Sequence, residues 1–123
     1  MSRVLIVDDE PSLRVLERLT LEDRGYDCDE AASGEEALQL HAEGGVGSPA
    51  WSVIVLDQRM TGLTGIEVAH ELRQRGDRTP IVLYSGWIDP EVEEQARALR
   101  VRPVDKVDHE RLLDVVDELA TAA

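Results

Sequence analysis

Three short runs of consecutive apolar residues place the strongest limit on how this chain can fold. They are VLIV at residues 4–7, VIVL at 53–56 and IVLY at 81–84. Runs of this length, rich in β-branched side chains, are typical of strands buried on both faces of a parallel sheet. Each run is followed at once by a polar residue, namely Asp8, Asp57 or Ser85. The sequence therefore predicts central parallel strands whose carboxyl ends carry polar side chains.

Helical signals separate these runs. Pro11 suits the first turn of a helix that stops near Gly25. Ser33 and Thr64 each precede a Glu by three residues, which is capping-box spacing for a helix start. The apolar positions at helical spacing in the first helix are Leu13, Leu16 and Leu19. The other expected elements are helices starting at Asp89-Pro90 and at Asp108, weaker strands at 26–31 and 101–104, and a loop over 44–49.

Five strands that alternate with five helices predict an open parallel sheet with helices on both faces. We expect an α/β, flavodoxin-like three-layer sandwich with strand order 2-1-3-4-5, formed as a single domain over residues 1–123. In such sheets ligands bind outside the carboxyl ends of the strands. The residues that end the expected strands are Asp8, Asp9, Asp57, Ser85 and Lys106.

Composition excludes several classes of function. The 13 Lys and Arg residues against 26 Asp and Glu residues give a net charge of −13, which repels nucleic acid and anionic lipid. We therefore expect no direct nucleic-acid or membrane partner. The single Cys28 excludes an internal disulfide, and the sequence starts without an apolar leader, so a cytoplasmic location is expected.

The acidic residues predict a metal site. If strands 4–7 and 53–56 are neighbours, Asp8, Asp9 and Asp57 converge, and their mutual repulsion requires a cation. Hard carboxylate oxygens in a small open site suit Mg²⁺. A carboxylate beside Mg²⁺ can attack a phosphoryl group, and Ser85 and Lys106 could bind the remaining phosphoryl oxygens. The expected product is an aspartyl phosphate.

Three motifs resemble the receiver domains of two-component response regulators, over residues 3–119. They are VLIVDDEP at 4–11, DQRMTGLTG at 57–65 and PIVLYSG at 80–86. The resemblance implies that Asp57 is the phosphoacceptor and that Ser85 and Lys106 hold the phosphoryl group. The implied Mg²⁺ ligands are Asp9, Asp57, Asp8 mainly through water, and the main-chain carbonyl of Arg59.

The region around Lys106 departs from the family pattern. The family usually has Lys-Pro with a cis bond, whereas this chain has Lys106-Val107. A cis bond before a residue other than proline costs about 2.5–4 kcal/mol, so either Val107 is trans or packing holds the strain. Arg102-Pro103 is the alternative match to Lys-Pro. Pro103 also occupies the place of the family's switch aromatic residue, so the usual relay cannot operate, and we hypothesise that Trp87 takes over part of the coupling.

The mouth of the expected site carries further departures. Thr61 stands where the family commonly has Pro. Arg59 could pair with Glu10 across the site. Arg59 and Trp87 occupy positions that influence the access of water in the family, so these bulky side chains predict slow self-dephosphorylation.

The resemblance implies a stand-alone receiver that is not a turnover enzyme and that takes its phosphoryl group from a histidine kinase or phosphotransfer protein. A downstream protein partner is expected on a basic face, and the basic residues in question are Arg97, Arg100, Arg102, Lys106 and Arg111. The alternative is an interaction module of the same fold that works without phosphorylation. An aspartyl phosphatase is disfavoured because residues 8–11 (DDEP) lack a second Asp two positions after the first. The acidic first loop likewise disfavours flavin binding.

Overall fold

The computed structural model describes residues 2–44, 51–86 and 88–121. The loop expected over 44–49, apart from Gly44, lies outside these residues, and so does Trp87. None of the described helices is long and apolar enough to cross a membrane.

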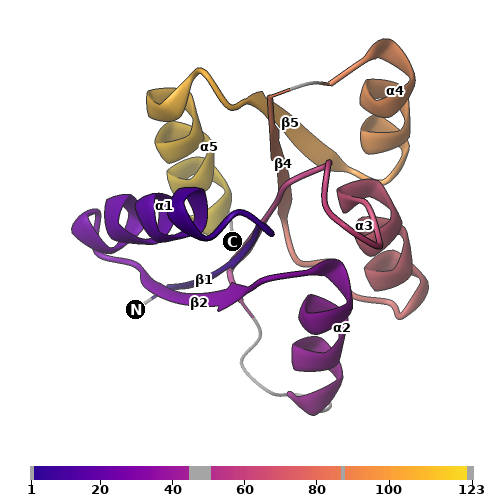
Figure 1. Cartoon of the computed structure of the whole chain (residues 1–123), viewed down its shortest axis with the longest axis horizontal. Coiled ribbons are helices and arrows are strands. Elements are labelled where there is room, and N and C mark those ends of the chain that lie inside the picture. The colour runs from indigo at the N-terminus through magenta and orange to yellow at the C-terminus, as the bar shows by residue number, and fades with distance from the viewer. Residues whose placement is uncertain (1, 45–50, 87, 122–123) are drawn as a thin grey trace.

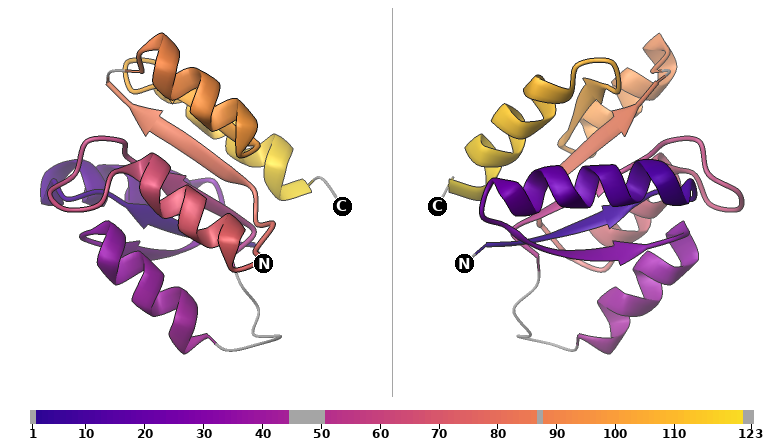
Figure 2. Two further views of the ribbon diagram at one scale, coloured as in Figure 1. Left: turned by 90° about the vertical axis from the view of Figure 1, so that its right-hand side faces the viewer. Right: turned by 60° about the vertical axis from the view of Figure 1, so that its left-hand side comes forward.

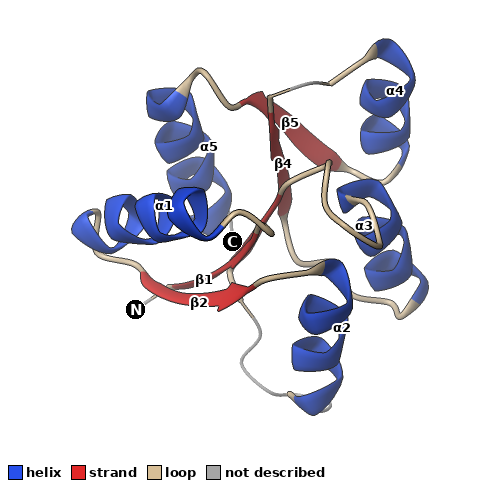
Figure 3. Ribbon diagram, in the orientation of Figure 1, coloured by secondary structure: helices blue, strands red, loops and turns tan. Residues whose placement is uncertain are grey.

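Five strands and five helices alternate along the described chain, which confirms the expected fold (Figure 3). The strands are all parallel and lie in the order β2-β1-β3-β4-β5. The strands are β1 (Arg3–Val7), β2 (Asp27–Ala31), β3 (Val53–Leu56), β4 (Ile81–Ser85) and β5 (Val101–Asp105). The helices are α1 (Pro11–Asp23), α2 (Gly34–Glu43), α3 (Gly65–Gln74), α4 (Pro90–Ala98) and α5 (His109–Thr121).

The helices form one layer on each face of the sheet (Figure 1). Helices α1 and α5 cover one face, and α2, α3 and α4 cover the other (Figure 2). Successive strand residues point to opposite faces, so Val4 and Ile6 pack with α1 and α5, while Leu5 and Val7 pack in the opposite core. This double burial explains why the three central strands are apolar without interruption.

The expected helix starts are confirmed. Thr64 and Glu67 form a capping box at α3, and the side chains of Ser33 and Asp89 accept main-chain hydrogen bonds at the starts of α2 and α4. Asp108 accepts a hydrogen bond from the main-chain N–H of Arg111 at the start of α5. These caps end each connection close to the carboxyl edge of the sheet.

Helix α1 presents an unexpected face to the sheet. Its buried residues are Glu17 and Leu21. Leu13, Leu16 and Leu19, which share helical spacing, are 41%, 55% and 54% exposed. The spacing of the leucines correctly indicated a helix, but these side chains lie in solvent.

Helix α3 starts in close contact with the end of β3. A Cβ atom on Gly65 would lie 2.5 Å from the main-chain oxygen of Asp57 and 2.7 Å from Leu83 Cδ1. Only glycine allows this approach, because backbone atoms cannot move aside cheaply. Gly65 therefore fixes the distance between α3 and the loop that carries Asp57.

We expect Gly65→Ala to destabilise the fold by about 1–3 kcal/mol, because the added methyl group overpacks this contact. The free energy of unfolding in urea measures the effect. Gly86→Ala is the matched control, since a Cβ there would meet nothing within 4 Å. Equal unfolding midpoints for the two variants would contradict this prediction.

Candidate functional site

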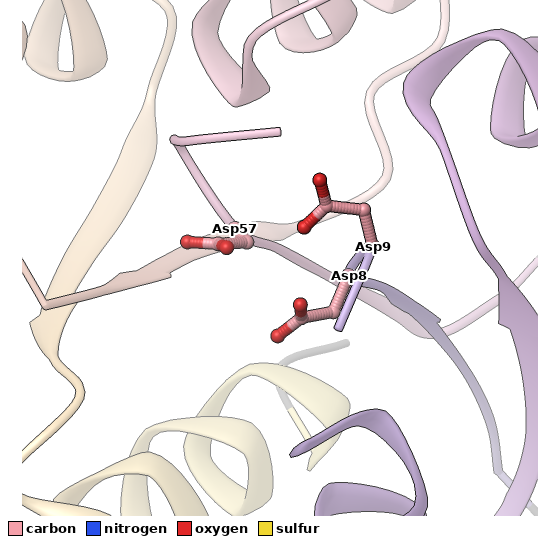
Figure 4. A group of neighbouring side chains, drawn as sticks. All are labelled: Asp8, Asp9 and Asp57. Atoms are coloured by element: carbon pink, nitrogen blue, oxygen red, sulfur yellow. The ribbon is translucent and has the colours of Figure 1, made fainter. Parts of the chain in front are cut away.

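Three carboxylates meet at the carboxyl ends of β1 and β3. Val7 pairs with Leu56 in the sheet, so Asp8 and Asp57 leave the two strands side by side. The Asp57 N–H donates to the Val7 carbonyl at 3.0 Å. Carboxylate oxygens of Asp8, Asp9 and Asp57 lie within 4.8 Å of one another (Figure 4). The predicted convergence of these three residues is thus present.

Hydrogen bonds from neighbouring loops orient the two β1 carboxylates. Asp8 is buried, and its Oδ1 accepts from the Glu10 N–H at 2.9 Å. Asp9 is exposed, and its Oδ2 accepts from the Thr61 N–H at 3.0 Å and from the Thr61 hydroxyl at 3.3 Å. The loop after β3 therefore holds Asp9 over the site.

Lys106 supplies a positive charge at this cluster. Its Nζ lies 2.9 Å from Asp8 Oδ2 and 3.4 Å from Asp57 Oδ2. Burial alone would lower the pKa of Lys106, but the hydrogen bond to Asp8 and the charges of Asp57 and Asp8 together raise it. Lys106 is therefore a cation in the folded protein, and it offsets part of the repulsion among the carboxylates.

The surroundings of Asp57 have opposing effects on its pKa. Burial and the nearby charge of Asp8 raise its pKa, and the charge of Lys106 and hydrogen bonds to Lys106 and Ser85 only partly oppose them. Ser85 is buried at the end of β4 and reaches the Asp57 carboxylate. The structure therefore brings together Asp8, Asp9, Asp57, Ser85 and Lys106, as predicted.

The turn around Lys106 forms without proline. The described residues include no cis peptide bond, so Lys106-Val107 is trans. Asp105 shapes the turn, because its Oδ1 accepts from the Val107 N–H at 3.0 Å and its carbonyl accepts from the Asp108 N–H at 2.9 Å. Arg102 lies near the start of β5, where it contacts Glu118 at 3.5 Å. Lys106, and not Arg102, is the cation of the site.

Three other sequence expectations have different outcomes. The Arg59–Glu10 ion pair does not form, and the Glu10 carboxylate accepts from Ser12 at the start of α1. Pro103 lies in the edge strand β5, opposite Leu83. Trp87 lies outside the described residues, so the coupling role expected of it stays a prediction.

One of the five basic residues expected on a partner face belongs to the site instead. Lys106 points into the acidic cluster. Arg97 contacts Glu93 on its own helix at 3.4 Å, and Arg102 contacts Glu118 of α5. Lys106 is therefore not part of the expected partner face, and the face formed by Arg97, Arg100, Arg102 and Arg111 stays a prediction.

The contact of Thr61 and the presence of Glu17 at the site were not predicted from the sequence. Thr61 donates its main-chain N–H to Asp9, a bond that the family's usual proline could not make. Glu17 is buried behind the cluster, where Asp8, Asp57 and Lys106 all influence its pKa, and its Oε2 has no hydrogen-bond partner within the described structure. The spacing of Glu17 and Leu21, four residues apart, places both on one face of α1. Leu13, Leu16 and Leu19 indicated a different face as the buried one.

Donor chemistry and geometry agree on a cation site. Three carboxylate oxygens within 4.8 Å of one another form a hard donor set of the kind that Mg²⁺ binds. A family model, the response regulator receiver domain, matches residues 4–116. This chain belongs to the response regulator receiver family.

Individual proteins resemble this receiver in sequence and in structure. The transcriptional regulatory protein ResD of Bacillus subtilis is 38% identical over 82 residues, which are 67% of this chain and 32% of ResD. The chain spans about a third of the length of the curated relatives that it matches first.

Two solved receivers cover almost the whole chain. TrrA of Thermotoga maritima is 32% identical with a TM-score of 0.83, covering 97% of this chain and 99% of TrrA. CheY4 of Vibrio cholerae is 31% identical with a TM-score of 0.83, covering 97% and 98%. TrrA has been solved with Mg²⁺-BeF and also in complex with the histidine kinase ThkA.

Glu17 is expected to make this receiver less stable as the pH rises. Burial, followed by the charge of Asp8, raises the pKa of Glu17 from 4.5 to about 8. Between these values the folded protein keeps a proton that the unfolded chain releases, so the free energy of unfolding falls with increasing pH. Glu17→Gln removes this titration and should lose less stability between pH 5 and pH 8, by about 1–4 kcal/mol.

Urea unfolding with a chelator present, at several pH values, measures this difference. Asp23→Asn is the control, because Asp23 is exposed on the same helix. The prediction is wrong if Glu17→Gln and the parent lose stability in parallel.

Proposed function

We propose that this receiver accepts a phosphoryl group on Asp57 in the presence of Mg²⁺ and passes the signal on by protein contact. The observation that carries this proposal is the cluster of Asp8, Asp9 and Asp57 with Lys106 beside it. Carboxylates this close together repel one another unless cations neutralise them. Mg²⁺ would do so together with Lys106, and the two cations would then attract a phosphoryl group.

Mg²⁺ would be held by oxygens of Asp8, Asp9 and Asp57, with the main-chain carbonyl of Arg59 as a further ligand. When bound, the ion neutralises the carboxylates and offsets the charge that develops on the transferred group. Thr61 and the Glu10 N–H keep Asp9 and Asp8 oriented for this purpose. The β1 acids therefore need little rearrangement to bind the ion.

Asp57 would act as the nucleophile. A carboxylate oxygen of Asp57 forms a bond to phosphorus while the bond between phosphorus and the donor's imidazole nitrogen breaks, and the imidazole keeps the electron pair. Lys106 Nζ, 3.4 Å from Asp57, would bind a phosphoryl oxygen, and the Ser85 hydroxyl would turn from Asp57 to another. The protein ends the step covalently modified, which makes it a phosphoryl carrier and not a turnover enzyme.

The donor is proposed to be a histidine kinase or a phosphotransfer protein, as the ThkA complex of TrrA supports. Helix α1 starts two residues after Asp9 and exposes three leucines, at positions 13, 16 and 19. An exposed apolar group beside an active site favours protein contact. A downstream protein partner remains proposed for the basic side chains Arg97, Arg100, Arg102 and Arg111, and the setting for these contacts would be the cytoplasm.

Incubation with acetyl phosphate and Mg²⁺ tests the proposal through the intact mass of the protein. We expect one phosphoryl adduct on the parent, and none on Asp57→Asn or after Mg²⁺ is chelated. Asp29→Asn is the matched control. Asp29 lies on β2, where it pairs with Arg3 of β1 and is outside the cluster, so this variant should gain the adduct like the parent. A folded parent that gains no adduct would support the phosphorylation-independent interaction module instead.

A further inference from the structure

A cavity lies at the amino ends of β4 and β5, whereas Asp57 lies at the carboxyl edge of the sheet. Its volume is about 600 Å³, and it is lined by the loop between α3 and β4, the turn between α4 and β5, and the end of α5. This volume falls within the range of small-molecule sites. The proposed phosphoryl transfer makes no use of it.

The cavity is strongly basic in an acidic protein. Four arginines line it, Arg73, Arg78, Arg100 and Arg102, although the net charge of the chain is −13. The only carboxylate in the lining is Asp77, and Glu118 beside the lining neutralises Arg102 at 3.5 Å. The Asp77 oxygens accept from Thr79 N–H at 2.7 Å and contact His41 Nε2 at 2.7 Å, so that carboxylate is already engaged. The local charge therefore favours an anion.

Arg73 builds the wall of the cavity. Its guanidinium donates to the carbonyls of Leu99 at 2.9 Å, Thr79 at 2.9 Å and Asp77 at 3.1 Å. These bonds tie the loop before β4 to the turn before β5. The two segments that carry the other arginines are thus held together before any ligand arrives.

Arg78 and Arg100 are available for a ligand. Neither makes an ion pair with any residue in the described ranges, and both are exposed. Arg100 adopts φ +59°, a left-handed conformation that non-glycine residues seldom take. Burial lowers the pKa of Arg73, and the nearby charge of Arg100 lowers it further. A bound anion would relieve this repulsion.

The floor of the cavity is apolar. Pro80, Leu99 and Leu119 contribute to it, next to the arginines. A ligand that combines a charged group with an apolar or planar body would use both parts of the lining. An inorganic anion would contact only the arginines.

We propose that this cavity binds an organic phosphate of nucleotide size. Arg78 and Arg100 would hold the phosphate oxygens, and the organic part would rest on the apolar floor. This site is separate from Asp57, so a ligand could bind here without contacting Asp57.

Calorimetric titration with adenosine diphosphate tests the proposal, at low salt and with a chelator present so that the acidic cluster carries no metal. The double variant Arg78→Gln/Arg100→Gly removes two charges, and glycine tolerates the left-handed φ of residue 100. Arg97→Gln/Arg111→Gln removes the same charge outside the cavity and is the matched control. Unfolding midpoints confirm that both variants are folded.

We expect saturable binding by the parent and the control variant, with affinity at least about tenfold weaker in the double variant. Absence of saturable binding to the folded parent would overturn the proposal, as would equal losses in the two variants. Inorganic pyrophosphate is the second probe. If pyrophosphate binds as tightly as adenosine diphosphate, the apolar floor takes no part and an organic ligand is excluded. Because acetyl phosphate labelling of Asp57 is measured separately, failure here leaves the proposed phosphoryl transfer intact.

Discussion

The attraction between Lys106 and the carboxylates of Asp8 and Asp57 is the interaction on which this site depends. Parallel strands in register bring Asp8 and Asp57 to one edge of the sheet, where partial burial increases their repulsion. Lys106 reaches both from the end of β5, across β4 to Asp57 and across β4 and β3 to Asp8. The repulsion is therefore offset only when β1, β3 and β5, which are far apart in sequence, are assembled in one sheet. The stability of the site depends on the correct assembly of that sheet.

Glu17 adds a buried polar group to this arrangement, because burial raises its pKa to about 8 and the folded protein keeps it protonated near neutral pH. It occupies one of only two buried positions of α1, next to a cluster that already contains more acids than bases. A leucine at this position would pack against the sheet without an unsatisfied oxygen, so Glu17 makes the fold less stable than the sequence's apolar content alone would allow. Buried acids that lower stability are concentrated at functional sites in proteins.

Much of this architecture follows from local sequence patterns. The apolar runs, the caps and the acids that follow β1 and β3 are signals within a few residues of one another, and they predicted the strands, the helices and the acidic cluster. The face that α1 turns to the sheet was not predictable in the same way, because leucines and a glutamate compete for it and only tertiary packing decides. The contacts of Thr61 and Asp105 depend on loop conformations that residue spacing does not encode.

The two edges of the sheet differ from its centre in a way that bears on self-association. Edge strand β2 has the sequence DCDEA, and edge strand β5 contains Pro103, which has no N–H to offer. Acidic side chains on one edge and a missing donor on the other both hinder the addition of a strand from another molecule. A sheet with such ends resists growth into cross-β aggregates, even though its three central strands are among the most aggregation-prone segments a chain can carry.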